Sequence, residues 1–141
     1  MLYDIFLKKP RPCPFCNLTK DEILKSNKSA ILTLARAPYT KDHLLVTPKK
    51  HHLTIKSLSK KEKEDIEKLI LYGLKKVHNK HKNVSILYRE GNKKEIGKSV
   101  NHLHVHIIPK LQIGAGKLSK RKIFSEKEYV EKIKKIKKHL A

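Results

Sequence analysis

Three histidines at alternate positions form the stretch of this sequence with the clearest chemistry. His102, His104 and His106 are separated by single apolar residues, and more apolar residues follow them. Because side chains on a β-strand point alternately to its two faces, a strand over 99–109 would place all three imidazoles on one face. Imidazole is a nucleophile, a general base, a hydrogen-bond donor to phosphate and a metal ligand near neutral pH. The spacing therefore predicts a functional strand, and an ordinary polar strand face fits this strict alternation poorly.

The residues just before the histidines are suited to binding a phosphate group. Gly97 allows the backbone to approach an anion closely, Lys98 adds a positive charge, and Ser99 has a hydroxyl group that can donate to a phosphate oxygen. The motif lacks the leading glycine and the spacing of a Walker P-loop. Its weight comes from its position directly before the three histidines, where it predicts a phosphate-binding segment.

The two cysteines indicate a metal site. Cys13 and Cys16 are two residues apart between prolines, which makes a poor disulfide framework. A Cys-x-x-Cys pair of this kind is half of a metal site or a redox pair. No thioredoxin-like strand precedes the pair, so a metal is favoured, and free cysteines remain the alternative.

Capping boxes and apolar spacing predict the elements that position these residues. Three motifs of the type Ser/Thr-x-x-Glu mark helix starts, and they predict helices over about 20–26, 59–78 and 125–140. The predicted strands are 30–35, 43–47, 84–89 and 99–109, with a loop over 90–98 and an irregular lead-in over 1–18. His43 is expected to cap or pack at the start of its strand. The sum is a single α+β domain over 1–141, an antiparallel sheet with helices packed on it.

The chain carries a large positive charge. It has 34 basic and 13 acidic residues, a net charge of +21, and such a field attracts phosphates. Only four of the basic residues are arginines and aromatic residues make up 6% of the chain, whereas nucleic-acid readers usually interleave arginines with aromatics. A Lys-rich composition is therefore favoured over nucleic-acid binding, which stays open as the alternative. The sequence has neither a long apolar run nor a signal peptide, so we expect a cytoplasmic protein with no membrane partner.

Together these motifs resemble the histidine-triad family of nucleotide hydrolases and transferases. His-apolar-His-apolar-His-apolar-apolar is the family's signature. Residues 97–100 resemble its Gly-Gln-Ser-Val approach, and 43–51 resemble its strand followed by Pro-Lys-Arg/Lys-His. The cysteine pair resembles the Cys-x-x-Cys that opens many bacterial and archaeal members, which suggests the zinc-containing branch. The four blocks cover most of residues 13–110.

The resemblance implies a fold and a reaction. It implies a five-stranded antiparallel sheet, and a homodimer that pairs through the long helix and a sheet edge. His104 would attack the α-phosphorus of a nucleotide to form a nucleotidyl-imidazole intermediate, which water resolves. His106 would hydrogen-bond a phosphate oxygen or the leaving group. Because the galactose-1-phosphate uridylyltransferase branch has Gln at the position of His106, hydrolysis is favoured.

The expected substrates of such a hydrolase are dinucleoside polyphosphates or nucleoside phosphoramidates. Two alternatives remain open. One is a zinc-stabilised, non-catalytic module that binds nucleotides or nucleic acids. The other is a deadenylase that acts on adenylylated nucleic acid ends.

The resemblance also implies a set of metal ligands. Zinc with a structural role would be held by Cys13, Cys16, His51 and His102, a set that gives closed tetrahedral coordination. His52 competes with His51 for its place in the set.

The nucleoside pocket departs from the family's pattern. Ala35 stands where many members have an Asn or Asp that holds the ribose hydroxyls, and alanine cannot form that hydrogen bond. Arg36 is the candidate to compensate, and Arg89 stands where a phosphate-contacting Asn or Gln is common. Leu32 and Leu34 are candidates for a base pocket, although both also suit a core strand.

Overall fold

The computed structural model describes residues 2, 5, 12–112 and 121–140. Most of the predicted lead-in before residue 12 therefore lies outside the described residues. The chain divides into two compact units, Met1–Leu111 and Gln112–Ala141. The second unit contains helix α4 (Glu126–Leu140), which confirms the predicted C-terminal helix, while the single domain over 1–141 stays a prediction. None of the helices in the described parts of the chain is long and apolar enough to cross a membrane.

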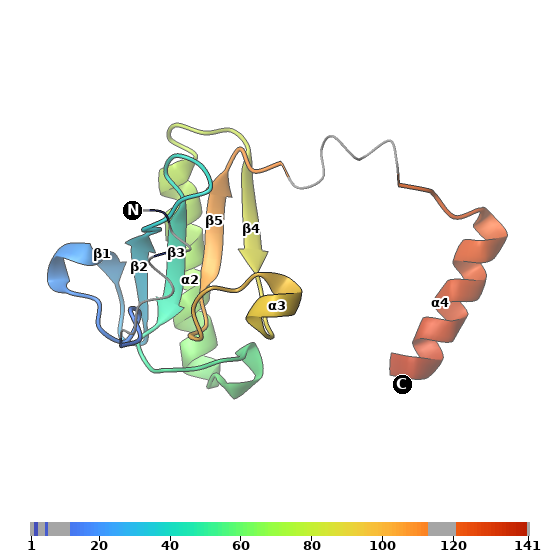
Figure 1. Ribbon diagram of the computed structural model, residues 1–141, viewed down its shortest axis with the longest axis horizontal. Coiled ribbons are helices and arrows are strands. Elements are labelled where there is room, and N and C mark those ends of the chain that lie inside the picture. The colour runs from blue at the N-terminus through green and yellow to red at the C-terminus, as the bar shows by residue number, and fades with distance from the viewer. Residues whose placement is uncertain (1, 3–4, 6–11, 113–120, 141) are drawn as a thin grey trace. The chain divides into compact units, whose positions relative to one another are not determined.

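Five antiparallel strands form one sheet in the first unit, as predicted (Figure 1). The strand order is β1-β2-β3-β5-β4. The strands are β1 (Ile23–Ser26), β2 (Ala30–Leu34), β3 (Leu44–Pro48), β4 (Val84–Tyr88) and β5 (Val105–Pro109). β5 carries His106 and lies between β3 and β4, so the end of the histidine row is fixed by hydrogen bonds on both sides.

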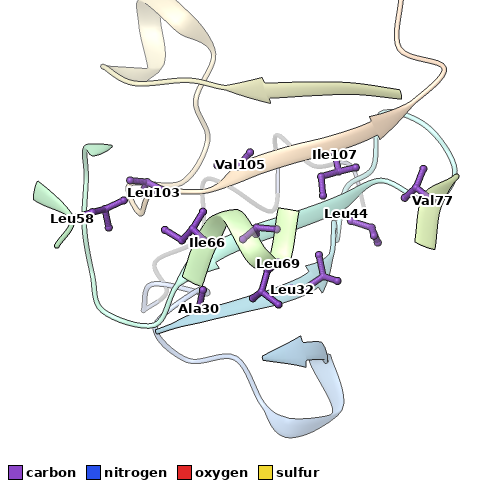
Figure 2. Packing of buried hydrophobic residues seen from close by; sticks show 11 residues of the cluster. Ala30, Leu32, Leu44, Leu58, Ile66, Leu69, Val77, Leu103, Val105 and Ile107 are labelled. Atoms are coloured by element: carbon purple, nitrogen blue, oxygen red, sulfur yellow. The ribbon is translucent and has the colours of Figure 1, made fainter. Parts of the chain in front are cut away.

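Helix α2 (Lys60–Val77) covers one face of the sheet and encloses the core (Figures 1 and 2). Its start confirms the predicted capping box, because the side chain of Ser59 accepts from the backbone N–H of Glu62. At Gly73 an added Cβ atom would lie 2.7 Å from Cδ1 of Ile107, so a larger residue there would displace the end of the Ile107 side chain. The apolar residues between the triad histidines join this core, namely Leu103, Val105 and Ile107. The predicted division of the segment into an apolar and a histidine face is therefore confirmed.

The helix predicted over 20–26 is wrong beyond its first turn. The segment forms a short 3₁₀ helix, η1 (Lys20–Glu22), and then continues as β1. The Glu22 side chain does accept from the backbone N–H of Thr19 at 3.4 Å. However, pairing of Ile23 and the following residues with β2 outweighs the local helix signal, because the strand ladder satisfies backbone N–H and C=O groups of this segment.

The strand predicted over 99–109 is too long, because only Val105–Pro109 joins the sheet. Two contacts take the preceding backbone out of the strand ladder. The N–H of Leu103 donates to the carbonyl of His52 at 2.7 Å, and Oγ1 of Thr47 donates to the carbonyl of Leu103 at 2.8 Å. The loop predicted over 90–98 also contains a helical turn, α3 (Lys93–Ile96), which Asn92 caps. Another short 3₁₀ helix, η2 (Ile55–Ser57), precedes α2.

Candidate active site and metal site

A cavity of about 770 Å³ lies on the histidine face of the sheet. His104 and His106 line it together, as the alternation predicted, and Gly97 and Ser99 line it as well. His102, although part of the same row, is fully buried and belongs to the neighbouring cysteine cluster. Of the three histidines, His102 therefore lies in the cysteine cluster, and His104 and His106 lie at the cavity.

The ring of His104 is held in one tautomer. Its Nδ1 lies 2.7 Å from the backbone carbonyl of His102. Since a carbonyl only accepts, Nδ1 carries the proton and Nε2 keeps a lone pair. Burial lowers the pKa of His104, and the charges of Lys98 and Arg89 lower it further, against the opposing effect of the carbonyl. A neutral imidazole with a free ring nitrogen thus stands at the cavity.

His106 belongs to a chain of hydrogen bonds that begins at the backbone. The N–H of Tyr39 donates to Nδ1 of His43 at 3.1 Å, so Nε2 of His43 carries a proton and donates it to Nδ1 of His106 at 2.9 Å. The remaining proton of neutral His106 is then on Nε2. Burial lowers the pKa of His43 to about 4 and that of His106 to about 3, so both rings are neutral at pH 7. His106 therefore presents an N–H group.

Sequence reasoning missed the position of His43 in this site. Leu45 pairs with His106, and residues two apart on a strand share a face, so His43 lies on the histidine face. The period of its strand was visible in the sequence. The register between the strands, which brings the two rings together, was not.

The buried pair should make the fold less stable in acid. Because the pKa of His43 is about 4 in the folded chain and 6.5 for an ordinary exposed histidine, the unfolded chain binds more protons between these two values. The free energy of unfolding therefore falls as the pH is lowered through this range. For His43 alone we expect a loss of about 2 kcal/mol between pH 7 and pH 5.

Urea unfolding of the wild type and of His43→Gln at both pH values measures this contribution, because glutamine does not titrate. The variant should lose about 2 kcal/mol less than the wild type. Acid release of a bound metal affects both proteins and cancels in the difference. Equal losses would show that His43 is protonated as easily in the folded chain as in the unfolded one.

Gly97 ends the helical turn that precedes the three histidines. Its φ of 71° is a left-handed conformation that glycine adopts readily, and it ends α3 with its N–H donating to the carbonyl of Lys93 at 2.9 Å. An added Cβ atom there would meet no described protein atom within 4 Å, so the positive φ rather than packing within the protein favours glycine, and a role in phosphate binding stays a prediction. Lys98 is 5% exposed and does not line the cavity.

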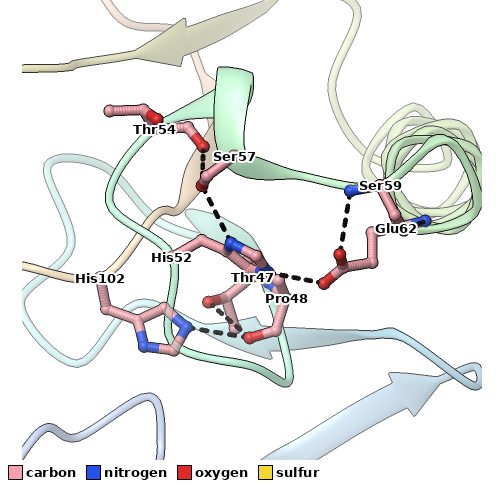
Figure 3. A network of polar contacts seen from close by, with 8 residues as sticks. All are labelled: Thr47, Pro48, His52, Thr54, Ser57, Ser59, Glu62 and His102. Atoms are coloured by element: carbon pink, nitrogen blue, oxygen red, sulfur yellow. Dashed lines mark hydrogen bonds and ion pairs between the residues drawn. The ribbon is translucent and has the colours of Figure 1, made fainter.

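Four sulfur and nitrogen donors converge beside the cavity. Sγ of Cys13 and Cys16 and one nitrogen each of His51 and His102 all lie within 4.8 Å of one another. Nε2 of His102 donates to the carbonyl of Pro48 at 2.9 Å (Figure 3), which leaves the Nδ1 lone pair directed at the thiols. Two thiols and two imidazoles with one ring nitrogen fixed by a backbone carbonyl fit a tetrahedral metal ion. The predicted set is therefore brought together in space.

The competition between His51 and His52 is settled by a second set of contacts. Nδ1 of His52 lies 2.9 Å from Oγ of Ser57, and its Nε2 lies 2.8 Å from Oε2 of Glu62 (Figure 3). Both ring nitrogens of His52 are thereby engaged at the start of α2. Nδ1 of His51 lies 3.2 Å from Sγ of Cys16, so the place in the cluster belongs to His51.

Comparison with known proteins identifies the family to which the chain belongs. The model of the HIT domain matches residues 18–113. The chain belongs to the HIT family. This HIT protein is 32% identical over 102 residues to an adenosine 5′-monophosphoramidase of Schizosaccharomyces pombe, which covers 70% of this chain and 74% of the relative. It is 31% identical over 108 residues to an uncharacterized HIT-like protein of Mycoplasma genitalium, with 74% and 77% covered.

Solved structures show the same fold. A HIT family protein of Bacillus subtilis matches with a TM-score of 0.69 at 22% identity, covering 93% of this chain and 99% of the other. A diadenosine triphosphate hydrolase of Plasmodium falciparum matches with a TM-score of 0.57 at 26% identity, covering 87% and 78%. The family and the α+β fold that the sequence suggested are thus confirmed.

Three of the residues considered for nucleoside binding lie together at the cavity of this HIT protein. Ala35 lines the cavity with no polar side-chain group, and Leu34 and Arg36 line it beside Ala35. Arg36 also pairs with Glu22 at 4.0 Å. Leu32 was expected as a candidate for the base pocket, but it is 1% exposed and lies in the core beneath α2, so it does not reach the cavity.

Proposed function

We propose that this HIT protein is a nucleotide hydrolase that cleaves its substrate at the α-phosphate through a nucleotidyl intermediate on His104. One observation carries the proposal. The lone pair on Nε2 of His104 is fixed by the 2.7 Å contact of Nδ1 with a carbonyl, and the ring lines the same cavity as the N–H donor His106. A fixed neutral nucleophile beside a fixed donor is what attack on a phosphorus atom needs.

The proposed substrates are dinucleoside polyphosphates or nucleoside phosphoramidates. Two similar proteins support this choice by their names, an adenosine 5′-monophosphoramidase and a diadenosine triphosphate hydrolase. The cavity of about 770 Å³ is in the range of ligand pockets for molecules of this size.

The proposed reaction has two displacements at phosphorus. Nε2 of His104 forms a bond to the α-phosphorus, the bond from phosphorus to the leaving atom breaks, and its electron pair goes to that atom. The N–H of His106 donates to the leaving group or to a phosphate oxygen. Water then attacks the phosphorus, the bond to Nε2 breaks with its electron pair returning to His104, and the water's proton passes to solvent. The nucleoside monophosphate is released and the imidazole is restored.

The direct test is product formation together with trapping of the intermediate. Purified protein is mixed with diadenosine tetraphosphate and, separately, with an adenosine phosphoramidate. We expect AMP release from at least one of them, and mass spectrometry after rapid quenching should find AMP attached to His104. Binding of AMP without turnover of either substrate would instead favour a non-catalytic nucleotide-binding module.

We also propose that the metal in the cysteine and histidine cluster is zinc with a structural role. Two cysteine and two histidine ligands complete tetrahedral coordination and leave no open position for a substrate. The chemistry such an ion supplies is the cross-linking of three chain segments, one before η1, one after β3 and one before β5. The ligand on the segment before β5 is His102, which is two residues from His104.

We propose that the chain forms a homodimer through the edge of the sheet at β4. Within the described residues β4 pairs with β5 alone, and an unpaired edge is a site for strand addition. Ile86 on this edge pairs with Ile107, whose side chain is in the core, so Ile86 lies on the same face of the sheet as the core. Ile86 is nevertheless 50% exposed. On α2, Leu71 is 58% exposed. A second copy placed at β4 and α2 would cover such apolar side chains.

Ile86→Glu should convert the dimer into a monomer, because it would bury an unpaired charge in each half of the interface. Light scattering after size-exclusion chromatography measures the mass. The matched control is Leu24→Glu, an equally exposed apolar residue on β1 at the opposite edge of the sheet, which should leave the dimer intact. If Leu24→Glu were a monomer and Ile86→Glu a dimer, the interface would be assigned to the edge at β1 instead.

A further inference from the structure

Arg89 lies beside the proposed nucleophile, on the histidine face of the sheet. Tyr88 pairs with Val105 and Leu87 pairs with His106 in the antiparallel register of β4 and β5. Arg89 follows Tyr88 at the end of this ladder, next to the segment that carries His104, and Leu87, two residues before Arg89, shares the face of His106. The positive charge of Arg89 also lowers the pKa of His106. Its guanidinium is therefore close enough to act electrostatically on the atoms that react.

Contacts with Tyr39 hold the guanidinium in place. Nη1 of Arg89 donates to the hydroxyl oxygen of Tyr39 at 2.9 Å, and Cζ lies 5.7 Å from the centre of the Tyr39 ring. The Tyr39 ring in turn stacks on His43, with 5.4 Å between ring centres and 13° between planes, and lies 6.3 Å from the ring of His106. The cation is thus fixed toward the end of the row where His106 presents its N–H group.

The charge of Arg89 has no ion-pair partner among the residues that the structure describes. Its neighbour Glu90 instead accepts from the hydroxyl of Tyr88 at 2.9 Å and from the N–H of Ile55 at 3.3 Å. A fixed cation without a counter-ion, next to a site for phosphate chemistry, is available to an anion of the substrate.

We infer that Arg89 binds an anionic leaving group, so that the protein prefers nucleotides whose α-phosphate is joined to a further phosphate over those joined to a neutral amine. This rests on the proposed function. When the bond between the α-phosphorus and the bridging oxygen breaks, the electron pair stays on the oxygen, and the leaving phosphate gains negative charge beside the guanidinium. An amine leaves by taking up a proton and ends neutral, so a neighbouring cation gives it no such stabilisation.

The test compares two leaving groups in four proteins. The substrates are diadenosine triphosphate and the morpholine amide of AMP, whose leaving group is a neutral amine. The proteins are the wild type, Arg89→Gln, Arg89→Lys and Lys75→Gln. The last removes an exposed lysine on α2 and controls for the general positive field. For each protein, kcat/KM for both substrates is measured on the same preparation, and calorimetric AMP binding gives the folded fraction. The ratio of the two kcat/KM values therefore depends only on the leaving group.

Arg89→Gln should lower the ratio of kcat/KM, triphosphate over amide, by about a hundredfold, the scale seen when one donor to a developing anion is removed. Arg89→Lys should restore most of the ratio, and Lys75→Gln should leave it unchanged. An unchanged ratio in Arg89→Gln would overturn the inference. If kcat/KM fell equally on both substrates, Arg89 would act on the α-phosphate, and if neither value fell, Arg89 would act on neither group. Failure of the wild type to turn over either substrate would overturn the proposed function as well, which separates the two results.

Discussion

His104→Ala should reduce kcat by about four orders of magnitude or more, which corresponds to about 5.5 kcal/mol of activation free energy. The structure fixes the Nε2 lone pair of His104 at the cavity, because Nδ1 lies 2.7 Å from the His102 carbonyl. Without it, water must attack the α-phosphorus directly and no covalent intermediate shares the barrier. Steady-state kinetics on a dinucleoside polyphosphate measure the loss.

Two variants control this result. His104→Asn removes the nucleophile with a smaller change of polarity and should lose as much. His106→Ala should cost less, roughly 10²- to 10⁴-fold, because it removes a donor rather than the attacking atom. AMP binding measured by calorimetry should survive in all three. Near-normal turnover by His104→Ala would exclude the covalent mechanism.

Cys13→Ser should remove zinc and lower the free energy of unfolding by several kcal/mol, because binding of a structural metal is coupled to folding. Cys13, Cys16, His51 and His102 come from segments far apart in the sequence, and their donor atoms lie within 4.8 Å of one another. Elemental analysis should find one zinc per chain in the wild type and none in the variant. Urea unfolding gives the loss of stability, and a chelator should produce the same loss in the wild type.

The adjacent histidines provide a matched pair for the metal experiment. His51→Ala should lose zinc, whereas His52→Ala should keep it, because His52 contacts Ser57 and Glu62 instead. Wild-type protein purified without chelators and found free of stoichiometric metal would remove the proposal. Zinc loss in His52→Ala with retention in His51→Ala would exchange their assignments.

Local signals predicted the elements that are stabilised locally. Helix α2 was predicted within one residue at each end, because Ser59, Glu62 and the apolar spacing are all within the segment itself. The predictions were wrong where contacts with distant segments of the chain determine the secondary structure. Ile23–Ser26 became a strand because β2 was available for pairing, and the histidine strand began only at Val105 because Leu103 bonds to His52.

The candidate site shows the same division between local pattern and register. The family resemblance predicted the metal cluster and the division of the triad, and the donor atoms of the cluster do lie together. The contact of His43 with His106 and the place of Arg89 beside His104 depend on how β3 and β4 align with β5. A single sequence does not contain that alignment. The failure of Leu32 as a base-pocket residue has the same origin, because the covering helix decides which face of β2 is core.

His102 has one further consequence, which concerns binding equilibria. Its ring nitrogen is directed into the cysteine cluster and its carbonyl accepts from Nδ1 of His104. A metal that orders this residue therefore also orders the ring that faces the nucleotide. Coupling free energies are reciprocal. If the proposed metal and nucleotide both bind, a nucleotide that prefers the ordered arrangement must raise the affinity for the metal by the same factor, and the two proposed sites would be thermodynamically coupled.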